Sequence, residues 1–223
     1  MKATTNRQFG FTLIEMIVSL AIFTTVLTVS VGALLVLVGT NQQLQNEQGV
    51  MTNLSFALDS MAREIRTGTR YFCDSRDNLN DGAGGEKIFQ DGGDLDADPV
   101  QDCPDGNNTD RNFHGMSFVE GGGSVTGASD TRIVYFFDGK PGSVNEGKIL
   151  RRVSGEDAQS IVSSGIYITD AEFYVSGSAP LSSGVGETDQ SMVTIFIEAR
   201  DVNDAAAKPY RVQTTITQRT LDI

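Results

Sequence analysis

A long, almost unbroken apolar segment dominates the amino-terminal part of the chain. Residues 11–38 contain one acid, Glu15, and no base. About 20 apolar residues in a helix cross the hydrocarbon core of a bilayer, so this segment can span it with some tilt. It is too long for a secretory signal and has no small-residue cleavage site at its end. We therefore predict a membrane-spanning helix over residues 11–39.

After this segment, residues 40–68 show an amphipathic pattern. Apolar side chains recur there at steps of three and four, the spacing of one helix face: Met51, Leu54, Leu58, Met61 and Ile65. No proline interrupts the chain before Pro99, and Gly68 offers a stop. One helix of about 84 Å could therefore run from Phe11 to Arg66. The apolar stripe could form a coiled-coil seam between chains, but we favour packing on a sheet of the same chain, because that sheet needs a covering layer.

The carboxy-terminal half, residues 116–223, alternates apolar and polar positions and is rich in β-branched residues. Clusters of Gly, Ser, Pro and Asp separate the strands that this pattern predicts, over residues 131–137, 148–153, 166–169, 171–175, 192–198 and 210–217. The short connections favour antiparallel pairing. The predicted fold class is therefore α+β, with a long amino-terminal helix whose amphipathic half packs on an antiparallel sheet.

The middle of the chain, residues 69–115, has the Asp, Asn and Gly content that is typical of a loop region. Eleven acids and two bases lie between Asp74 and Asp110. A connection this long is expected to be tied down or functional. A disulfide between Cys73 and Cys103 would tie it, and closing a loop of about 30 residues would stabilise the fold by about 3–4 kcal/mol. Two free thiols are the alternative.

The same region contains an incomplete calcium-loop pattern. Five aspartates occupy positions 1, 3, 5, 9 and 12 of such a loop: Asp94, Asp96, Asp98, Asp102 and Asp105. Calcium takes six to eight oxygen ligands at this kind of spacing. The sixth position is Pro99 instead of glycine, however, and proline cannot adopt the positive φ of the sharp turn. An irregular calcium site and a solvated acidic loop remain open alternatives, and we expect no cofactor to be required.

Composition disfavours several classes of function. The net charge of −12 opposes binding to nucleic acid, with Arg132, Arg151 and Arg152 as the only local hint of a basic patch. His114 is the single histidine, and two cysteines cannot hold an iron–sulfur cluster or a four-cysteine zinc site. No nucleophile accompanies a plausible base, so we do not expect an enzyme.

The start of the apolar segment carries a specific motif. A short polar leader, residues 1–10, contains Lys2 and Arg7 and ends in Gly10, and Phe11-Thr-Leu-Ile-Glu15 follows. This arrangement resembles the processing signal of type IV pilins and of the pseudopilins of type II secretion. An uncleaved single-span anchor with an accidental Glu15 is the alternative.

The resemblance implies processing and assembly. A prepilin peptidase would cut between Gly10 and Phe11 and methylate the new amino group of Phe11. The basic leader would keep the amino terminus in the cytoplasm, so that a single pass through the inner membrane places the rest outside, where disulfides persist. Glu15, costly in lipid when unpaired, would pair with the amine of a neighbouring subunit. The implied partners are other pilin subunits, the peptidase, the inner-membrane assembly platform and the lipid bilayer.

A finer resemblance rests on Arg63-Glu-Ile-Arg66 at the end of the predicted helix and on the β-rich half. Both are similar to J-type minor pseudopilins and to other large minor pilins, whereas the acidic middle departs from that subtype. The resemblance implies a structural subunit at the tip or in the initiation complex of a pseudopilus or pilus. The alternative is a membrane-anchored binding or adhesion module, including a component of a DNA-uptake pilus.

Overall fold

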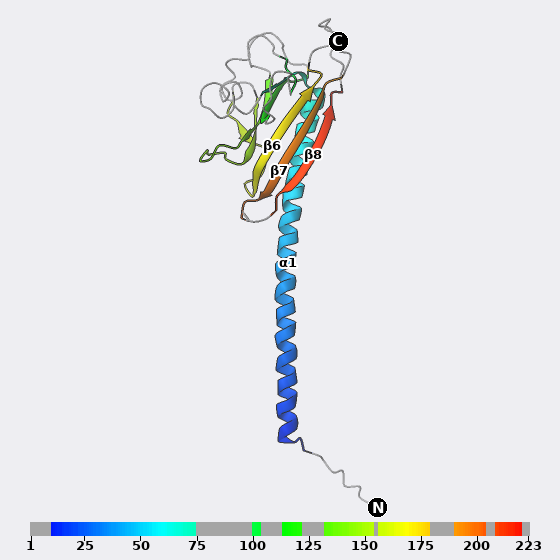
Figure 1. Ribbon diagram of the computed structural model, residues 1–223, viewed down its shortest axis with the longest axis vertical. Coiled ribbons are helices and arrows are strands. Elements are labelled where there is room, and N and C mark those ends of the chain that lie inside the picture. Colours follow the sequence, from blue (N-terminus) through cyan, green and yellow to red (C-terminus); the bar gives the residue numbers. More distant parts are fainter. Residues whose placement is uncertain are drawn as a thin grey trace, which may run out of the picture. The chain divides into compact units, whose positions relative to one another are not determined.

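The computed structural model describes residues 10–74, 100–103, 113–121, 132–153, 156–178, 190–203 and 208–219. These residues form the helix α1, Leu13–Thr67, and two antiparallel sheets (Figure 1). The predicted α+β class, a long amino-terminal helix packed with antiparallel strands, is confirmed. The chain divides into two compact units, Met1–Glu47 and Gln48–Ile223, and each is considered by itself below.

Helix α1 runs without a break through Gly32 and Gly39, and its last residue directly precedes Gly68. From Gln48 onward it buries one face: Val50, Leu54, Ala57, Leu58, Met61 and Ile65. These side chains share one apolar core with both sheets. The stripe therefore packs on sheets of the same chain, as predicted, rather than forming a coiled-coil seam. Met51 was wrongly assigned to this face and is 43% exposed. At about 100° per residue, Met51 lies at the margin of the stripe and Val50 lies inside it.

The first sheet has five strands in chain order, each antiparallel to the next. Its strands are β1 (Thr69–Asp74), β2 (Gly115–Val119), β3 (Arg132–Asp138), β4 (Lys148–Val153) and β5 (Gln159–Ser160). Strands β3 and β4 match predicted strands. Strand β1 lies in the region predicted as loop, because a six-residue strand next to an acidic, glycine-rich stretch has too little alternation to stand out.

The second sheet has three antiparallel strands, β6 (Ile166–Ser176), β7 (Met192–Asp201) and β8 (Tyr210–Thr217), which lie side by side in Figure 1. Two predicted strands, 166–169 and 171–175, are in fact the single strand β6. Its register against β7 shifts between Ile168 and Asp170. An extra residue at such a bulge interrupts the apolar alternation without ending the strand. That interruption explains why the sequence suggested two strands.

The carboxy-terminal end of α1 is fixed by contacts with both sheets. The Tyr71 hydroxyl donates to the carbonyl oxygens of Ile65 (2.6 Å) and Gly68 (2.8 Å). The Arg219 amide, just after β8, donates to the Arg66 carbonyl oxygen at 2.8 Å. The last carbonyls of a helix have no partner within the helix, so these bonds stabilise its end. A Cβ on Gly68 would lie 2.3 Å from Phe118 Cδ2, which explains the glycine there.

Candidate functional site

The amino-terminal end of α1 is set by Thr12. The Thr12 hydroxyl accepts a hydrogen bond from the Glu15 amide at 3.3 Å, and its carbonyl accepts from the Met16 amide at 3.2 Å. Thr12 is therefore the N-cap, with Glu15 at the third helical position. The spacing Thr12-x-x-Glu15 is the sequence signal for this cap, a role not predicted above. Gly10 and Phe11 precede the cap and are exposed, so a cut between them leaves every bond of the cap in place.

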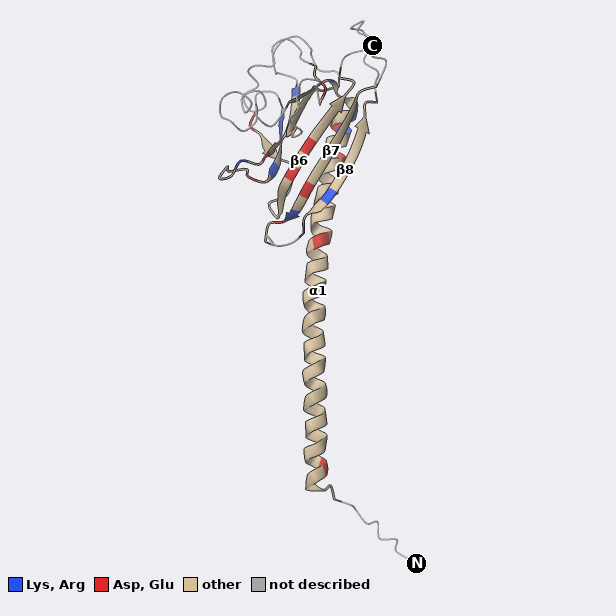
Figure 2. Ribbon diagram, viewed as in Figure 1, with Lys and Arg blue, Asp and Glu red and all other residues tan. Residues whose placement is uncertain are grey.

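From Met16 to Val38, large apolar side chains are exposed on all sides of α1. No part of its most apolar stretch is buried within the protein, and the helix is long and apolar enough to cross a membrane. The sequence has no charged residue between Glu15 and Glu47, and Figure 2 shows a long stretch of α1 without blue or red. A helix that is hydrophobic all round is typical of a lipid or helix-bundle environment.

Hydroxyl groups in this span are satisfied by the helix itself. Four of them donate to carbonyl oxygens one turn earlier, at 2.8–3.0 Å: Thr24 to Leu20, Thr25 to Ala21, Thr28 to Thr24 and Ser30 to Val26. In hydrocarbon a polar group without a partner is costly, so these bonds adapt the helix to lipid. Glu15 is left as the single ionisable side chain of residues 11–46.

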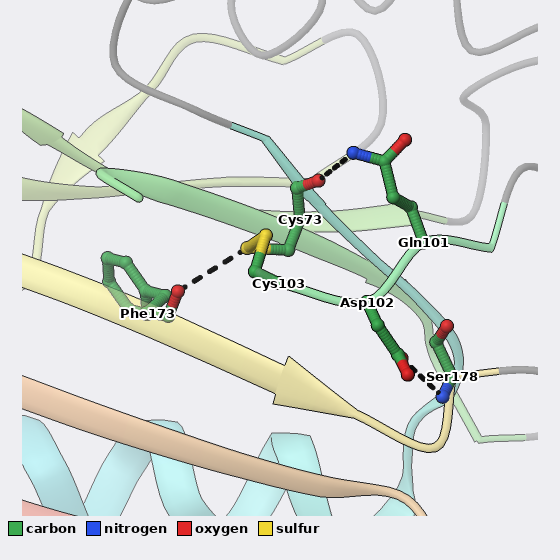
Figure 3. The surroundings of a disulfide bond; sticks show 6 residues. All are labelled: Cys73, Gln101, Asp102, Cys103, Phe173 and Ser178. Carbon is green, nitrogen blue, oxygen red and sulfur yellow. Dashed lines mark hydrogen bonds between the residues drawn. A yellow bond between two sulfur atoms is a disulfide. The ribbon is translucent and has the colours of Figure 1, made fainter. Parts of the chain in front are cut away.

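The disulfide that the sequence predicted, Cys73–Cys103, is present in the core, where its sulfur atoms lie between β1 and β6 (Figure 3). The chain around Cys103 continues this link. The Gln101 side-chain amide donates to the Cys73 carbonyl at 2.9 Å, and the Cys103 amide donates to the Val175 carbonyl at 2.8 Å. Residues 100–103 therefore join the first sheet to the edge of β6.

Asp102 is the one aspartate of the predicted calcium set that lies in the described part of the chain. Its carboxylate accepts hydrogen bonds from the Gly177 amide (3.1 Å) and the Ser178 amide (2.8 Å), as Figure 3 shows for Ser178. Asp102 thus caps the chain as it leaves β6. The other members, Asp94, Asp96, Asp98 and Asp105, lie outside the described residues, and calcium binding stays a prediction. Within the described ranges, no group of three His, Cys, Asp or Glu side chains could hold a metal ion.

A charged cluster links α1 to the first sheet. Glu64 Oε2 accepts from the Tyr135 hydroxyl at 2.7 Å and from Arg151 Nε at 2.9 Å. Burial, together with the Glu64 carboxylate, raises the pKa of Tyr135 far above its ordinary value. Burial lowers the pKa of Arg151, but the Glu64 contact outweighs it and the net direction is upward. Tyr135 is therefore a neutral donor and Arg151 a cation at neutral pH.

The three arginines that hinted at a basic patch do not form one. Arg132 and Arg152 are buried, and Arg151 is paired with Glu64. Arg132 donates to the Ser117 hydroxyl (3.2 Å) and to a backbone carbonyl. Burial and a nearby arginine lower its pKa to about 10. The cations hinted at by the sequence are thus parts of the fold.

His114, the single histidine, is a core residue. It is buried, its ring stacks on Phe137 at a centroid distance of 5.3 Å, and its Nε2 lies 3.9 Å from Asp170 Oδ1. Its carbonyl accepts a hydrogen bond from the Phe137 amide. This environment matches the structural role that a lone histidine most often has.

A carboxylate also organises the turn between β3 and β4. Glu146 accepts hydrogen bonds from the Gly142 amide (2.8 Å) and from the Tyr167 hydroxyl (2.9 Å). These two bonds lower the pKa of Glu146 below its ordinary value of 4.5. The turn is thereby joined to β6 by a charge-dependent contact.

Fold and geometry together define the class of the protein: an α+β domain that contains a buried disulfide and follows a long apolar helix with one acidic residue near its start. Residues 5–31 match the family model described as the prokaryotic N-terminal methylation motif. This match covers residues 5–10 of the leader, the predicted cleavage point and Glu15, and supports a type IV pilin-like precursor that is processed by prepilin peptidase. No curated protein and no solved structure matches the chain.

Proposed function

We propose that this protein is a structural minor subunit of a type II secretion pseudopilus or a type IV pilus-like filament. The observation that carries the proposal is the methylation motif at residues 5–31, placed on a helix that is apolar on every side. Residues 1–10 would remain on the cytoplasmic side before cleavage, and the domain from residue 48 onward would lie outside.

Cleavage between Gly10 and Phe11 would place a new amino group four residues before Glu15. In lipid, the amine and the carboxylate are each costly when unpaired. Pairing of the Glu15 carboxylate with the amine of a neighbouring subunit removes both costs at once. It also sets the axial position of one helix against the next. The apolar surface of α1 would then exchange lipid for the helices of other subunits, on the inner-membrane assembly platform.

A minor position, at the tip or in an initiation complex, is supported by the size of the domain. The part of the chain after the helix has two sheets with eight described strands and a long acidic sequence between β1 and β2, whereas major subunits of the resembling family are usually smaller. The stretch Arg63–Arg66, which resembles J-type pseudopilins, contains Glu64, and this residue fixes α1 to the first sheet.

A membrane-anchored binding or adhesion module is the alternative function. It would keep residues 1–10, because an anchor requires no free amino group at Phe11. The first experiment is therefore the mass of the amino-terminal peptide of the protein isolated from membranes of the source cell. A peptide that begins at N-methylated Phe11 is expected, and one that begins at Met1 would favour the anchor.

Assembly is tested by replacing the acidic residue of the span. Glu15→Gln keeps the shape of the side chain and removes its charge, so membrane insertion should persist while incorporation into filaments falls at least tenfold. Glu47→Gln, also on α1 but beyond the apolar span, is the matched control and should assemble normally. Normal incorporation of Glu15→Gln would refute the pairing.

A further inference from the structure

Among the described strands of the second unit, each sheet edge is covered or very short, with one exception. On the outer edge of β6, the Phe173 amide donates to the Phe113 carbonyl at 2.7 Å and the Val175 carbonyl accepts from Cys103 at 2.8 Å. On the outer edge of β1, Gln101 forms a parallel bridge with Phe72. The other edge of the first sheet is the two-residue strand β5, which is too short to pair with a further strand.

Strand β8, in contrast, has a long edge that no described element covers (Figure 1). It pairs with β7 over its whole length without a shift in register. The Gln218 amide donates to the Ser191 carbonyl, so these two residues form a hydrogen-bonded pair at the end of the ladder between β8 and β7. This pair fixes which backbone groups of β8 point toward β7 and which point outward. Hydrogen-bonded pairs alternate along an antiparallel ladder. The outward N–H and C=O groups therefore belong to Arg211, Gln213, Thr215 and Thr217.

A side-chain contact agrees with this assignment. Thr215 and Thr194 lie opposite each other, and their hydroxyl oxygens are 3.0 Å apart. Side chains approach most closely at the non-hydrogen-bonded pairs of an antiparallel ladder. The backbone groups of Thr215 consequently face away from β7.

The strand also lacks the features with which natural edge strands avoid pairing. Such strands are short, bulged, interrupted by proline or charged. Strand β8 has eight residues, no bulge and no internal proline, and it is rich in Val, Thr and Ile. Its single charge, Arg211, is held in an ion pair with Glu198. The edge is therefore suited to accept a further strand.

Charge indicates which kind of strand would fit. Residues 208–219 contain three bases, Lys208, Arg211 and Arg219, and no acid, in a chain with a net charge of −12. Lys208 and Arg219 are exposed at the two ends of the edge. Among its described strands, a second copy of this chain could offer only its own β8, and that pairing would bring like charges together.

We propose that the open edge of β8 binds an extended, acidic segment of a different filament subunit, which adds a fourth strand to the second sheet. Binding of such a partner presupposes the filament role proposed above. Main-chain hydrogen bonds from Arg211, Gln213, Thr215 and Thr217 would supply affinity, and the basic residues at both ends would select the acidic strand.

Hydrogen exchange of the wild-type chain tests the edge directly. Full-length protein in detergent micelles is compared, at single-residue resolution, with the same protein in filaments from the source cell. In micelles the amides of Arg211, Gln213, Thr215 and Thr217 should exchange fast, and those of the intervening residues slowly. In filaments the four outward amides should slow at least tenfold.

A pair of variants gives an independent test. Gln213→Pro removes one outward N–H and spares the ladder with β7, whereas Gln213→Ala removes only the side chain. The proline variant should enter filaments at least tenfold less than the alanine variant, with melting temperatures of the isolated proteins within a few degrees. If the proline variant fails to fold, the hydrogen-exchange comparison decides alone.

The outcomes separate this inference from the filament role. Wild-type chains in filaments with unchanged exchange of the four amides would overturn the edge proposal and leave the filament role standing. Absence of wild-type chains from filaments would overturn both. A disulfide between identical chains carrying Gln213→Cys, formed in filaments, would show that the occupant is a second copy and would overturn the choice of a different, acidic subunit.

Discussion

The disulfide between Cys73 and Cys103 is expected to make a large contribution to the stability of the second unit. Both cysteines are buried, and they join β1 to the stretch that contacts β6. Replacement of both by alanine removes the cross-link without adding a polar group to the core. The hydrogen bonds of Gln101 and Asp102 do not involve the sulfur atoms and can persist.

The magnitude follows from the length of the closed loop. The two cysteines are 30 residues apart. The chain-entropy relation for such a loop gives a loss of about 3.6 kcal/mol in the free energy of unfolding at 25 °C. That is a large part of the stability of a typical domain, roughly 5–15 kcal/mol.

The assay is a urea titration of the full-length protein in a non-ionic detergent, followed by near-ultraviolet circular dichroism. The tyrosines among the described residues lie in the second unit, so this signal follows the unfolding of that unit. Cys73→Ala and Cys103→Ala should each cost about as much as the double variant, because either change breaks the same bond. A loss below about 1 kcal/mol, or single losses that add up in the double variant, would refute the reasoning.

Three further predictions concern α1 and the turns around it. Met61→Ala should lower the free energy of unfolding by about 2–5 kcal/mol, because Met61 is fully buried. Met51 is exposed, so Met51→Ala should change this free energy little. Equal losses for the two variants in urea titrations would contradict the difference in burial. A double-mutant cycle of Glu64→Gln and Arg151→Met should give a coupling free energy of about 0.5–1.5 kcal/mol. Both side chains are about one-third exposed, so water weakens their ion pair only in part. Zero coupling would show that the ion pair does not stabilise the fold. Hydrogen bonds lower the pKa of Glu146, so its carboxylate stabilises the fold above pH 4.5 and loses this effect as the pH falls further. As the pH falls below 4.5, the melting temperature of Glu146→Gln should therefore drop less than that of the wild type. An identical drop in both proteins would count against the contact.

Much of this architecture follows from local patterns in the sequence. Residues 11–38 are apolar without a break, and a helix is the only single-chain element that satisfies its own backbone in lipid. Period-two alternation located β8 to the residue, because this strand buries one face only. The bounds of β4 also match the prediction, although β4 buries side chains on both faces. The methylation motif was also visible, since its residues are contiguous in the chain.

Other features depend on contacts between distant residues. The division of the strands into two sheets, the strand β1 and the continuity of β6 across its bulge all depend on pairing partners that local periodicity does not specify. Glu64 acquires its role only when α1 meets residues 71 and 87 positions further along the chain.

The sequence by itself therefore determined the anchoring helix, its processing motif and the α+β class, because each is encoded by neighbouring residues. It also determined the cysteine pairing, because the chain has only two cysteines. Only the tertiary structure decided which arginines are buried, that Asp102 caps the end of β6, and that β8 alone among the long described strands keeps an open edge. The physical reason is that a sheet edge is closed or left open by segments far away in the chain. Phe113 and Cys103 close β6, and no described segment does the same for β8.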